Sequence, residues 1–228
     1  MTNRLWMGLI VIGLAAALGI IALSQPWSRG PSSFADNGSV GRGRAIAARS
    51  CAVCHGADGE SASPQIPKLS DQEATYIVGQ LAAFKSEARR SDTMSAITAP
   101  LSRDDMADLA AFYASRAPAA PDTIEDGRPA TAGERIFFGA GPMTPSCAAC
   151  HERGGSGGMG MGGMGMMGGG LMGGAVAPRL DGQHAAYTVG QLDAFADGAR
   201  PDPIMTRVAS SLSAQARRAV AEYISGRR

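Results

Sequence analysis

Two short stretches of the sequence contain all four of its cysteines and two of its three histidines: residues 51–55 read Cys-Ala-Val-Cys-His, and residues 147–151 read Cys-Ala-Ala-Cys-His. In each stretch the two thiols lie three residues apart, and an imidazole follows directly. Thiols at this spacing can bond to the two vinyl groups of one porphyrin while the imidazole ligates its iron. The pattern therefore predicts two covalent haem c groups, attached at Cys51, Cys54 and His55 and at Cys147, Cys150 and His151.

Two other uses of paired cysteines fit this pattern less well. A zinc site would require the two stretches to converge on one metal and would leave one histidine of each unused. A thioredoxin-like dithiol does not require a histidine in the next position, and here that histidine occurs twice. If both pairs hold haem, no cysteine remains for a disulfide, a nucleophile or a thiolate iron ligand.

The two halves of the chain repeat one plan at a constant offset in residue number. Pro-x-Leu at residues 67–69 recurs at 178–180, and Tyr-x-x-Gly-Gln-Leu at 76–81 recurs at 187–192 without a gap. A shared register over this length indicates two copies of one helical unit, and two copies are too few for a solenoid. We therefore predict an all-α fold in which each copy is a domain with its own core.

Helical periodicity and capping residues define the elements of the first copy. We expect helices at residues 41–50 and at about 72–88, the second capped by Asp71, and a last helix capped by Ser102. The predicted organisation is a membrane anchor or signal peptide at 1–27, a tether at 28–40, domain 1 at 41–116, a linker at 117–130 and domain 2 at 131–228.

The repeat also selects a second iron ligand for each haem. Met94 and Met205 are the only methionines at equivalent positions, and one spare histidine, His184, is too few for two bis-histidine haems. A thioether ligand raises the haem potential and suits electron transfer. Ordinary core methionine is the alternative, but the polar residues before both positions are not typical of a helix core. We predict that Met94 and Met205 ligate iron.

Five further polar side chains have two interpretations each. Arg89 and Arg200 lie five residues before the two methionines, and Tyr76 and Tyr187 also match in the register. They could bind haem propionates, or they could be solvated arginines and packed tyrosines. We interpret His184 as a solvated surface residue, with distal ligation or proton relay as the alternative.

The N-terminus contains a long apolar run. Residues 5–23 include no charged side chain, and as a helix these 19 residues would measure roughly 28 Å, close to the thickness of a bilayer core. A cleaved signal peptide is the alternative, although its apolar region is usually shorter. Either interpretation predicts export of the rest of the chain, and we favour an anchor.

Domain 2 contains an insertion rich in glycine and methionine. Residues 154–174 include six methionines among glycines, and they make the span from His151 to Pro178 much longer than the equivalent span from His55 to Pro67. A flexible loop, an adaptable docking surface and a Cu(I) site made of thioethers are all compatible with this composition.

With both halves considered, the chain resembles the di-haem cytochrome c4 family over about residues 41–228. The shared pattern is Cys-x-x-Cys-His-Gly at 51–56, Pro-x-Leu at 67–69, Tyr-x-x-x-Gln-Leu-x-x-Phe at 76–84, Arg89 and Met94. Three features depart from it: Glu152 follows the second motif where the first has glycine, the Gly/Met insertion is added, and the possible anchor is atypical.

The resemblance implies a fold and a set of contacts. It implies two class-I-like cytochrome c domains, one haem each, packed about a pseudo-two-fold axis with their propionates facing. It also implies that the carbonyls of Pro67 and Pro178 accept hydrogen bonds from Nδ1 of the two histidines, which fixes the tautomer of each ring.

The expected function is electron transfer on the periplasmic side of the inner membrane. The donor would be a quinol-oxidising complex or a dehydrogenase, and the acceptor a haem–copper oxidase or a reductase. Alternatives are a dedicated subunit of a dehydrogenase complex, a di-haem peroxidase or thiosulfate-oxidising enzyme, and a copper-handling protein. The enzymes need an open or unusual axial position, which a methionine in both repeats argues against. The net charge of +1 and the absence of a basic stripe give no indication of a nucleic-acid partner.

Overall fold

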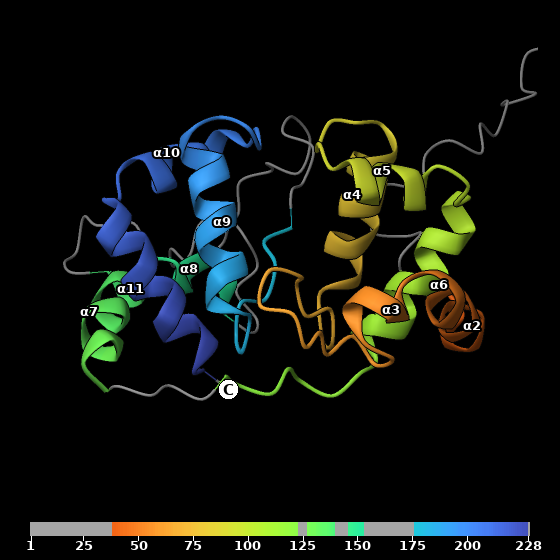
Figure 1. Cartoon of the computed structure of the whole chain (residues 1–228), viewed down its shortest axis with the longest axis horizontal. Coiled ribbons are helices and arrows are strands. Elements are labelled where there is room, and N and C mark those ends of the chain that lie inside the picture. The colour runs from red at the N-terminus through yellow and green to blue at the C-terminus, as the bar shows by residue number, and fades with distance from the viewer. Residues whose placement is uncertain (1–37, 123–126, 140–145, 153–175, 228) are drawn as a thin grey trace, which may run out of the picture. The chain divides into compact units, whose positions relative to one another are not determined.

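The computed structural model describes residues 38–122, 127–139, 146–152 and 176–227, and in these ranges every regular element is a helix (Figure 1). The predicted anchor, most of the tether and the Gly/Met insertion lie outside the described residues, so membrane attachment and copper binding stay predictions. Within those four ranges, no helix is long and apolar enough to cross a bilayer.

The helices form two sets with matching lengths. The first set is α2 (Val40–Ser50), α3 (Ala52–His55), α4 (Ala74–Lys85), α5 (Asp92–Thr98) and α6 (Arg103–Ala114). The second is α7 (Gly127–Phe138), α8 (Ala148–His151), α9 (Ala185–Ala196), α10 (Pro203–Ser210) and α11 (Ala214–Ser225). In the pairs α4/α9 and α6/α11, both ends of the two helices fall at equivalent positions of the sequence repeat. The predicted repeat is therefore also a repeat of structure, although α7 begins inside the predicted linker.

The starts of α6 and α4 differ in their local hydrogen bonds. The expected cap of α6 is confirmed: Ser102 Oγ accepts from the Asp105 amide at 3.1 Å, and Asp105 Oδ2 accepts from the Ser102 amide at 2.8 Å. This reciprocal pair is a capping box. The expected cap of α4 is wrong, because the helix begins only at Ala74 and Asp71 lies in a left-handed conformation with φ 55°. Gln72, the first of the two residues between them, directs its side chain to the other half of the molecule, and Glu73 occupies the N-cap position.

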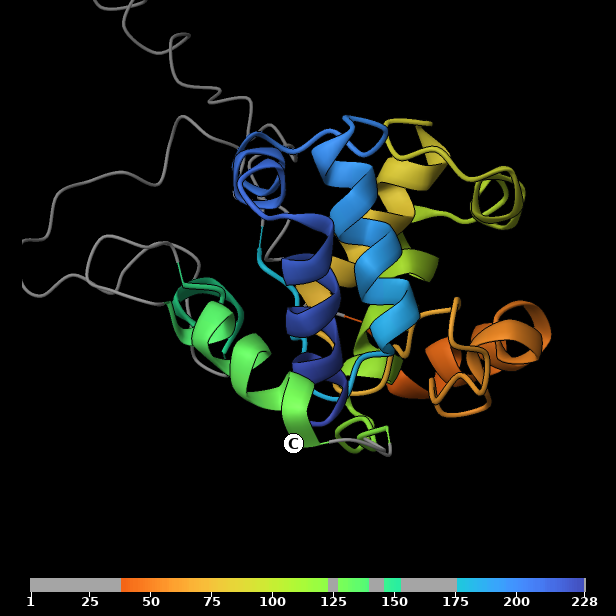
Figure 2. The same cartoon turned by 60° about the vertical axis from the view of Figure 1, so that its left-hand side comes forward.

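Each half is organised around two helices that cross with their backbones in contact. The helix pairs are α2 with α6 and α7 with α11 (Figures 1 and 2). A Cβ atom on Gly43 would lie 1.9 Å from the Asp108 carbonyl oxygen, and one on Gly133 would lie 2.2 Å from that of Ala219. Glycine is therefore required at both crossings because any larger side chain would separate the helices.

An ion pair joins α2 to α6 beside their crossing. Asp108 in α6 is 3% exposed. Its carboxylate accepts from Arg42 Nε at 2.6 Å and from the Ser39 amide at 2.6 Å, so it holds the first turn of α2. Burial alone would raise the pKa of Asp108, but these hydrogen bonds outweigh it and hold that pKa below its usual value.

The apolar cores end where the cysteine-bearing helices begin. The first cluster centres on Leu109, Phe112 and Tyr113, with Cys51 packed at its edge. The second centres on Phe137, Val220 and Ile224, with Cys147 and Met205 at its edge. Both cores therefore stop beside the residues predicted to hold haem.

We predict that Gly43→Ala lowers the free energy of unfolding by about 1–3 kcal/mol, because an added methyl overpacks the helix crossing. Gly79→Ala is the control. Gly79 is exposed on α4, and a Cβ atom added there would lie more than 4 Å from any neighbouring atom outside its own helix backbone. This substitution should be neutral or stabilising by up to about 1 kcal/mol. Urea unfolding of the two-haem protein measures both, and equal effects of the two substitutions would contradict the close approach at Gly43.

A second prediction concerns acid stability. The Asp108 contacts stabilise the protein above the unfolded pKa of about 3.9, and that contribution is lost as the pH falls through the lower folded pKa. The free-energy difference between the wild type and Asp108→Asn should be largest near neutral pH and should shrink on acidification below about pH 4. Urea unfolding at several pH values measures it, with the exposed Asp104→Asn as control. A difference independent of pH would contradict this role.

Candidate haem sites

The two predicted proximal histidines make the same hydrogen bond. His55 ends α3 with Nδ1 2.9 Å from the Pro67 carbonyl oxygen, and His151 ends α8 with Nδ1 2.8 Å from that of Pro178. A carbonyl only accepts, so Nδ1 carries the proton and Nε2 is the nitrogen available to a metal. Burial, partly opposed by this hydrogen bond, lowers the pKa of both rings. Both histidines are thus neutral, as a metal ligand must be.

The cysteines fit covalent attachment better than the two alternatives. All four are free thiols. Burial raises the pKa of Cys51 and Cys147, whereas a redox-active dithiol needs a thiol of lowered pKa. In the part of the chain that the structure describes, no group of three or more histidine, cysteine, aspartate and glutamate side chains could hold a metal ion, so a shared zinc site has no support.

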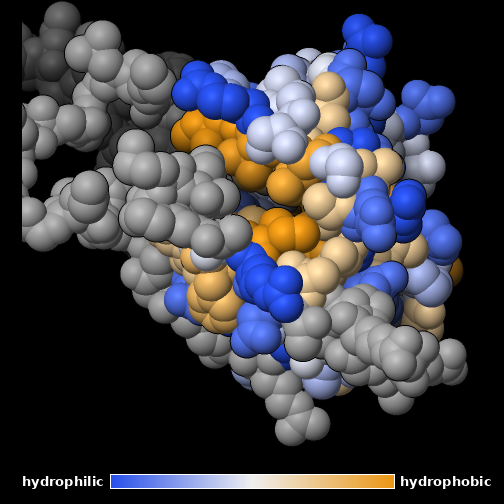
Figure 3. Space-filling view, turned by 90° about the vertical axis from the view of Figure 1, so that its left-hand side faces the viewer, coloured by the Kyte–Doolittle hydropathy of each residue, from blue (hydrophilic) through white to orange (hydrophobic). Residues whose placement is uncertain are grey.

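Space and chemistry beside the cysteines also fit a porphyrin. The buried Tyr113 hydroxyl makes no hydrogen bond of normal geometry among the described residues and has only the weakly polar Cys51 thiol beside it; burial, and then that thiol, raise the pKa of this phenol. A buried polar atom without a partner is unusual and indicates that a further group belongs there. On the side of the molecule where α7, α10 and α11 lie, apolar side chains gather around a hollow (Figure 3).

The predicted methionine ligands occupy equivalent positions in the first turns of α5 and α10. The Ser91 side chain accepts from the Met94 amide at 3.3 Å, and the Asp202 side chain accepts from the Met205 amide at 2.7 Å. N-caps turn both segments into short helices. In Figures 1 and 2, α5 lies at the opposite end of α4 from α3, which carries His55. Both methionines are half-buried, and iron ligation by them stays a prediction.

The predicted arginine and tyrosine residues form a reciprocal network between the two halves. Arg89 Nη2 donates to Tyr187 Oη at 2.9 Å, and Arg200 Nη2 donates to Tyr76 Oη at 3.0 Å. These side chains are therefore not free in solvent, and propionate binding by them stays a prediction. Sequence reasoning missed the two glutamines that complete the network, although both recur in the register: Gln80 and Gln191 each accept from Arg89 and Arg200.

The interpretation of His184 as a surface residue is wrong. It is 6% exposed, with Nε2 2.8 Å from the Ser61 carbonyl oxygen and Nδ1 3.1 Å from Asp122 Oδ2. Asp122 also accepts from the buried Lys68 Nζ at 2.9 Å. Helical periodicity could not reveal this burial, because the covering residues come from the first half and from the segment that follows it.

Glu152 marks a local difference between the two haem motifs. Gly56 follows the first motif with φ 79°, and a Cβ there would lie 2.3 Å from the Glu60 carbonyl oxygen. Glu152 follows the second motif with φ −76° and accepts from Arg227 Nη2 at 3.2 Å. The chain therefore leaves the two motifs in different directions, which removes the requirement for glycine in the second.

Comparisons with known proteins agree with this geometry. The cytochrome c family model matches the chain twice, at residues 40–116 and 130–227. Cytochrome c4 of Azotobacter vinelandii is 31% identical over 95% of this chain and 97% of its own, and the thiosulfate dehydrogenase electron acceptor of Stutzerimonas stutzeri is 37% identical over 78% of each. The crystal structure of reduced recombinant cytochrome c4 from Pseudomonas stutzeri superimposes with a TM-score of 0.69 at 32% identity, covering 84% of this chain and 100% of that one. The chain belongs to the cytochrome c4 family: it is an all-α electron carrier of two cytochrome c domains, with one haem c in each.

Proposed function

We propose that His55 and Met94 ligate one iron and that His151 and Met205 ligate the other. The observation that carries this proposal is the matched pair of caps that hold the two methionines at equivalent positions of the repeat. When bound, each haem supplies one-electron Fe(III)/Fe(II) chemistry. The role of the protein is to hold both ligands in place, so that little rearrangement accompanies the change of charge.

Two amino-acid ligands at each iron favour electron carriage over catalysis. A peroxidase or a thiosulfate-oxidising site needs an axial position open to the substrate or an unusual ligand such as a thiolate. The four cysteines of this chain are all in the attachment motifs, so none can serve as a ligand. The chain would therefore act between enzymes, as a carrier of their electrons.

We predict that Met94→Leu removes the methionine ligand from the first haem and that Met205→Leu removes it from the second. Each variant should lose half of the weak sulfur-to-iron absorption of the ferric protein and should lower the potential of one haem, because a thioether ligand raises it. Met106→Leu is the control, since Met106 is buried in the core of α6. Two unchanged low-spin haems in Met94→Leu or Met205→Leu would contradict the assignment.

We infer that the chain works on the periplasmic side of the inner membrane and that a dehydrogenase is its donor. Covalent haem and an apolar N-terminal run support export. Similarity to a thiosulfate dehydrogenase electron acceptor favours a dehydrogenase over a quinol-oxidising complex. The acceptor would be a haem–copper oxidase or a reductase.

Stopped-flow kinetics can separate the two donor classes. We expect thiosulfate dehydrogenase with thiosulfate to reduce the oxidised two-haem protein with a second-order rate constant of at least about 10⁵ M⁻¹s⁻¹, the lower end for specific protein association. The matched control is a quinol-oxidising complex with quinol at the same concentration. Faster reduction by the quinol-oxidising complex would reverse the choice of donor and leave the carrier function intact.

A further inference from the structure

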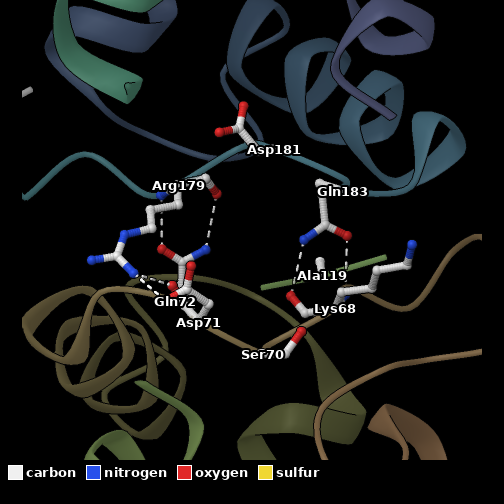
Figure 4. Close-up of a pocket in the computed structure, with 8 residues that line it drawn as sticks. All are labelled: Lys68, Ser70, Asp71, Gln72, Ala119, Arg179, Asp181 and Gln183. Atoms are coloured by element: carbon white, nitrogen blue, oxygen red, sulfur yellow. Dashed lines mark hydrogen bonds and ion pairs between the residues drawn. The ribbon is translucent and has the colours of Figure 1, made fainter. Parts of the chain in front are cut away.

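Two buried glutamines connect the halves of the molecule in a crossed manner. Gln72, 6% exposed, accepts through Oε1 from the Arg179 amide at 2.8 Å and donates through Nε2 to the Arg179 carbonyl at 3.0 Å. Gln183, 7% exposed, accepts from the Lys68 amide at 3.0 Å and donates to the Lys68 carbonyl at 2.9 Å. Figure 4 shows the two pairs side by side. Each glutamine is therefore bonded to the backbone of the opposite half.

The amide groups that these glutamines bind belong to the peptides that hold the haem ligands. The N–H of Arg179 and the C=O of Pro178 are parts of one peptide group, and that C=O accepts from His151 Nδ1 at 2.8 Å. In the same way, the N–H of Lys68 and the C=O of Pro67 belong to one peptide group, and that C=O accepts from His55 Nδ1 at 2.9 Å. A continuous chain of hydrogen bonds thus runs from each imidazole, through one peptide group, to a glutamine of the other domain.

Such a chain links the glutamine to the strength of the iron ligand. Hydrogen bonds in series polarise one another, and the effect is larger in a buried, low-dielectric site. An acceptor at the N–H end of a peptide places more negative charge on its carbonyl oxygen. That oxygen then forms a stronger bond with the imidazole N–H, and the imidazole becomes a more basic ligand. A more basic ligand favours Fe(III), so the glutamine lowers the haem potential.

Around Lys68 and Arg179, the glutamine–peptide contacts are what the repeat preserves. Arg179 and Lys68 are equivalent in the register, but their side chains bind different groups. Arg179 pairs with Asp71 at 2.5 Å and with Glu73 at 2.6 Å, whereas Lys68 Nζ binds Asp122 at 2.9 Å and the Gly182 carbonyl at 2.9 Å. The side-chain contacts of Lys68 and Arg179 therefore differ between the halves, while the glutamine–peptide contacts at their backbones are the same.

We propose that Gln72 and Gln183 are positioning residues that tune the haem of the opposite domain, Gln72 acting on His151 and Gln183 acting on His55. The consequence is a crossed dependence, in which a change in the first domain alters the electron affinity of the second haem. This inference rests on the two histidines as iron ligands and does not depend on the methionine ligands or on the donor.

The test uses Gln72→Leu and Gln183→Leu in the two-haem protein. Potentials of the two haems are measured by a redox titration followed by NMR, which distinguishes their methyl resonances. In Gln72→Leu, the Fe(III)/Fe(II) ratio of the second haem at a fixed applied potential should fall by about two- to tenfold, the range for one hydrogen bond. The Fe(III)/Fe(II) ratio of the first haem should change by less than half as much. In Gln183→Leu, the larger fall should occur at the first haem and the smaller change at the second.

A second readout reports the hydrogen bond itself. In the reduced, diamagnetic protein, the Nδ1–H resonance of His151 should move upfield in Gln72→Leu, because its hydrogen bond is weaker, and that of His55 should not. Gln80→Leu is the matched control, since Gln80 also binds across the interface but contacts Arg89 and Arg200 and neither proximal peptide. It should leave both Nδ1–H resonances in place.

Three results would overturn the proposal: a larger shift at the haem of the mutated domain, equal shifts at both haems, or no shift in either variant. If a leucine variant does not yield a two-haem protein, the shorter Gln72→Asn and Gln183→Asn are measured in its place and must give the same crossed pattern. The sulfur-to-iron absorption should be unchanged in all of these variants. Its loss in Met94→Leu or Met205→Leu tests the methionine assignment separately.

Discussion

The hydrogen bond between a histidine Nδ1 and a proline carbonyl is the contact around which each half is arranged. It fixes the tautomer of the ring and leaves Nε2 as the nitrogen that would be available to iron. The carbonyl must approach from a chain segment that follows the histidine, and the segment from Pro67 to Leu69 leads directly into the interface between the halves. The ligand geometry of one domain is therefore coupled to the packing of the other.

The two halves keep the same ligand geometry although the residues around them have diverged. Lys68 takes the place that Arg179 has in the second half, and Glu73 takes the place of His184. The buried Lys68 and His184 both reach Asp122, which belongs to the segment between the domains. Arg179 instead pairs with two carboxylates of the first half. The charged contacts at the interface therefore differ between the two halves, although the helices and the histidine–proline bonds repeat.

Local patterns predicted much of the fold because local interactions determine them. The repeat predicted that α4 and α9 begin and end at equivalent positions, and the position of Ser102 before a helical run predicted the cap of α6. The start of α4 and the burial of His184 were not predictable, since both depend on contacts between residues that are far apart in the chain. The sequence around Gln72 and Gln183 does not indicate that they bind the opposite half, although the two residues occupy equivalent positions of the repeat.

The different lengths of the two histidine–proline loops have a thermodynamic consequence. The His55–Pro67 contact closes a separation of 12 residues and the His151–Pro178 contact closes one of 27. Closing the longer loop costs roughly 0.7 kcal/mol more in chain entropy, since this cost grows only with the logarithm of length. That is comparable to the net contribution of one neutral hydrogen bond, about 0.5–1.5 kcal/mol. Gln72 binds Arg179, the residue after Pro178, from the opposite domain, and its two hydrogen bonds help to offset the extra entropy cost of the longer span.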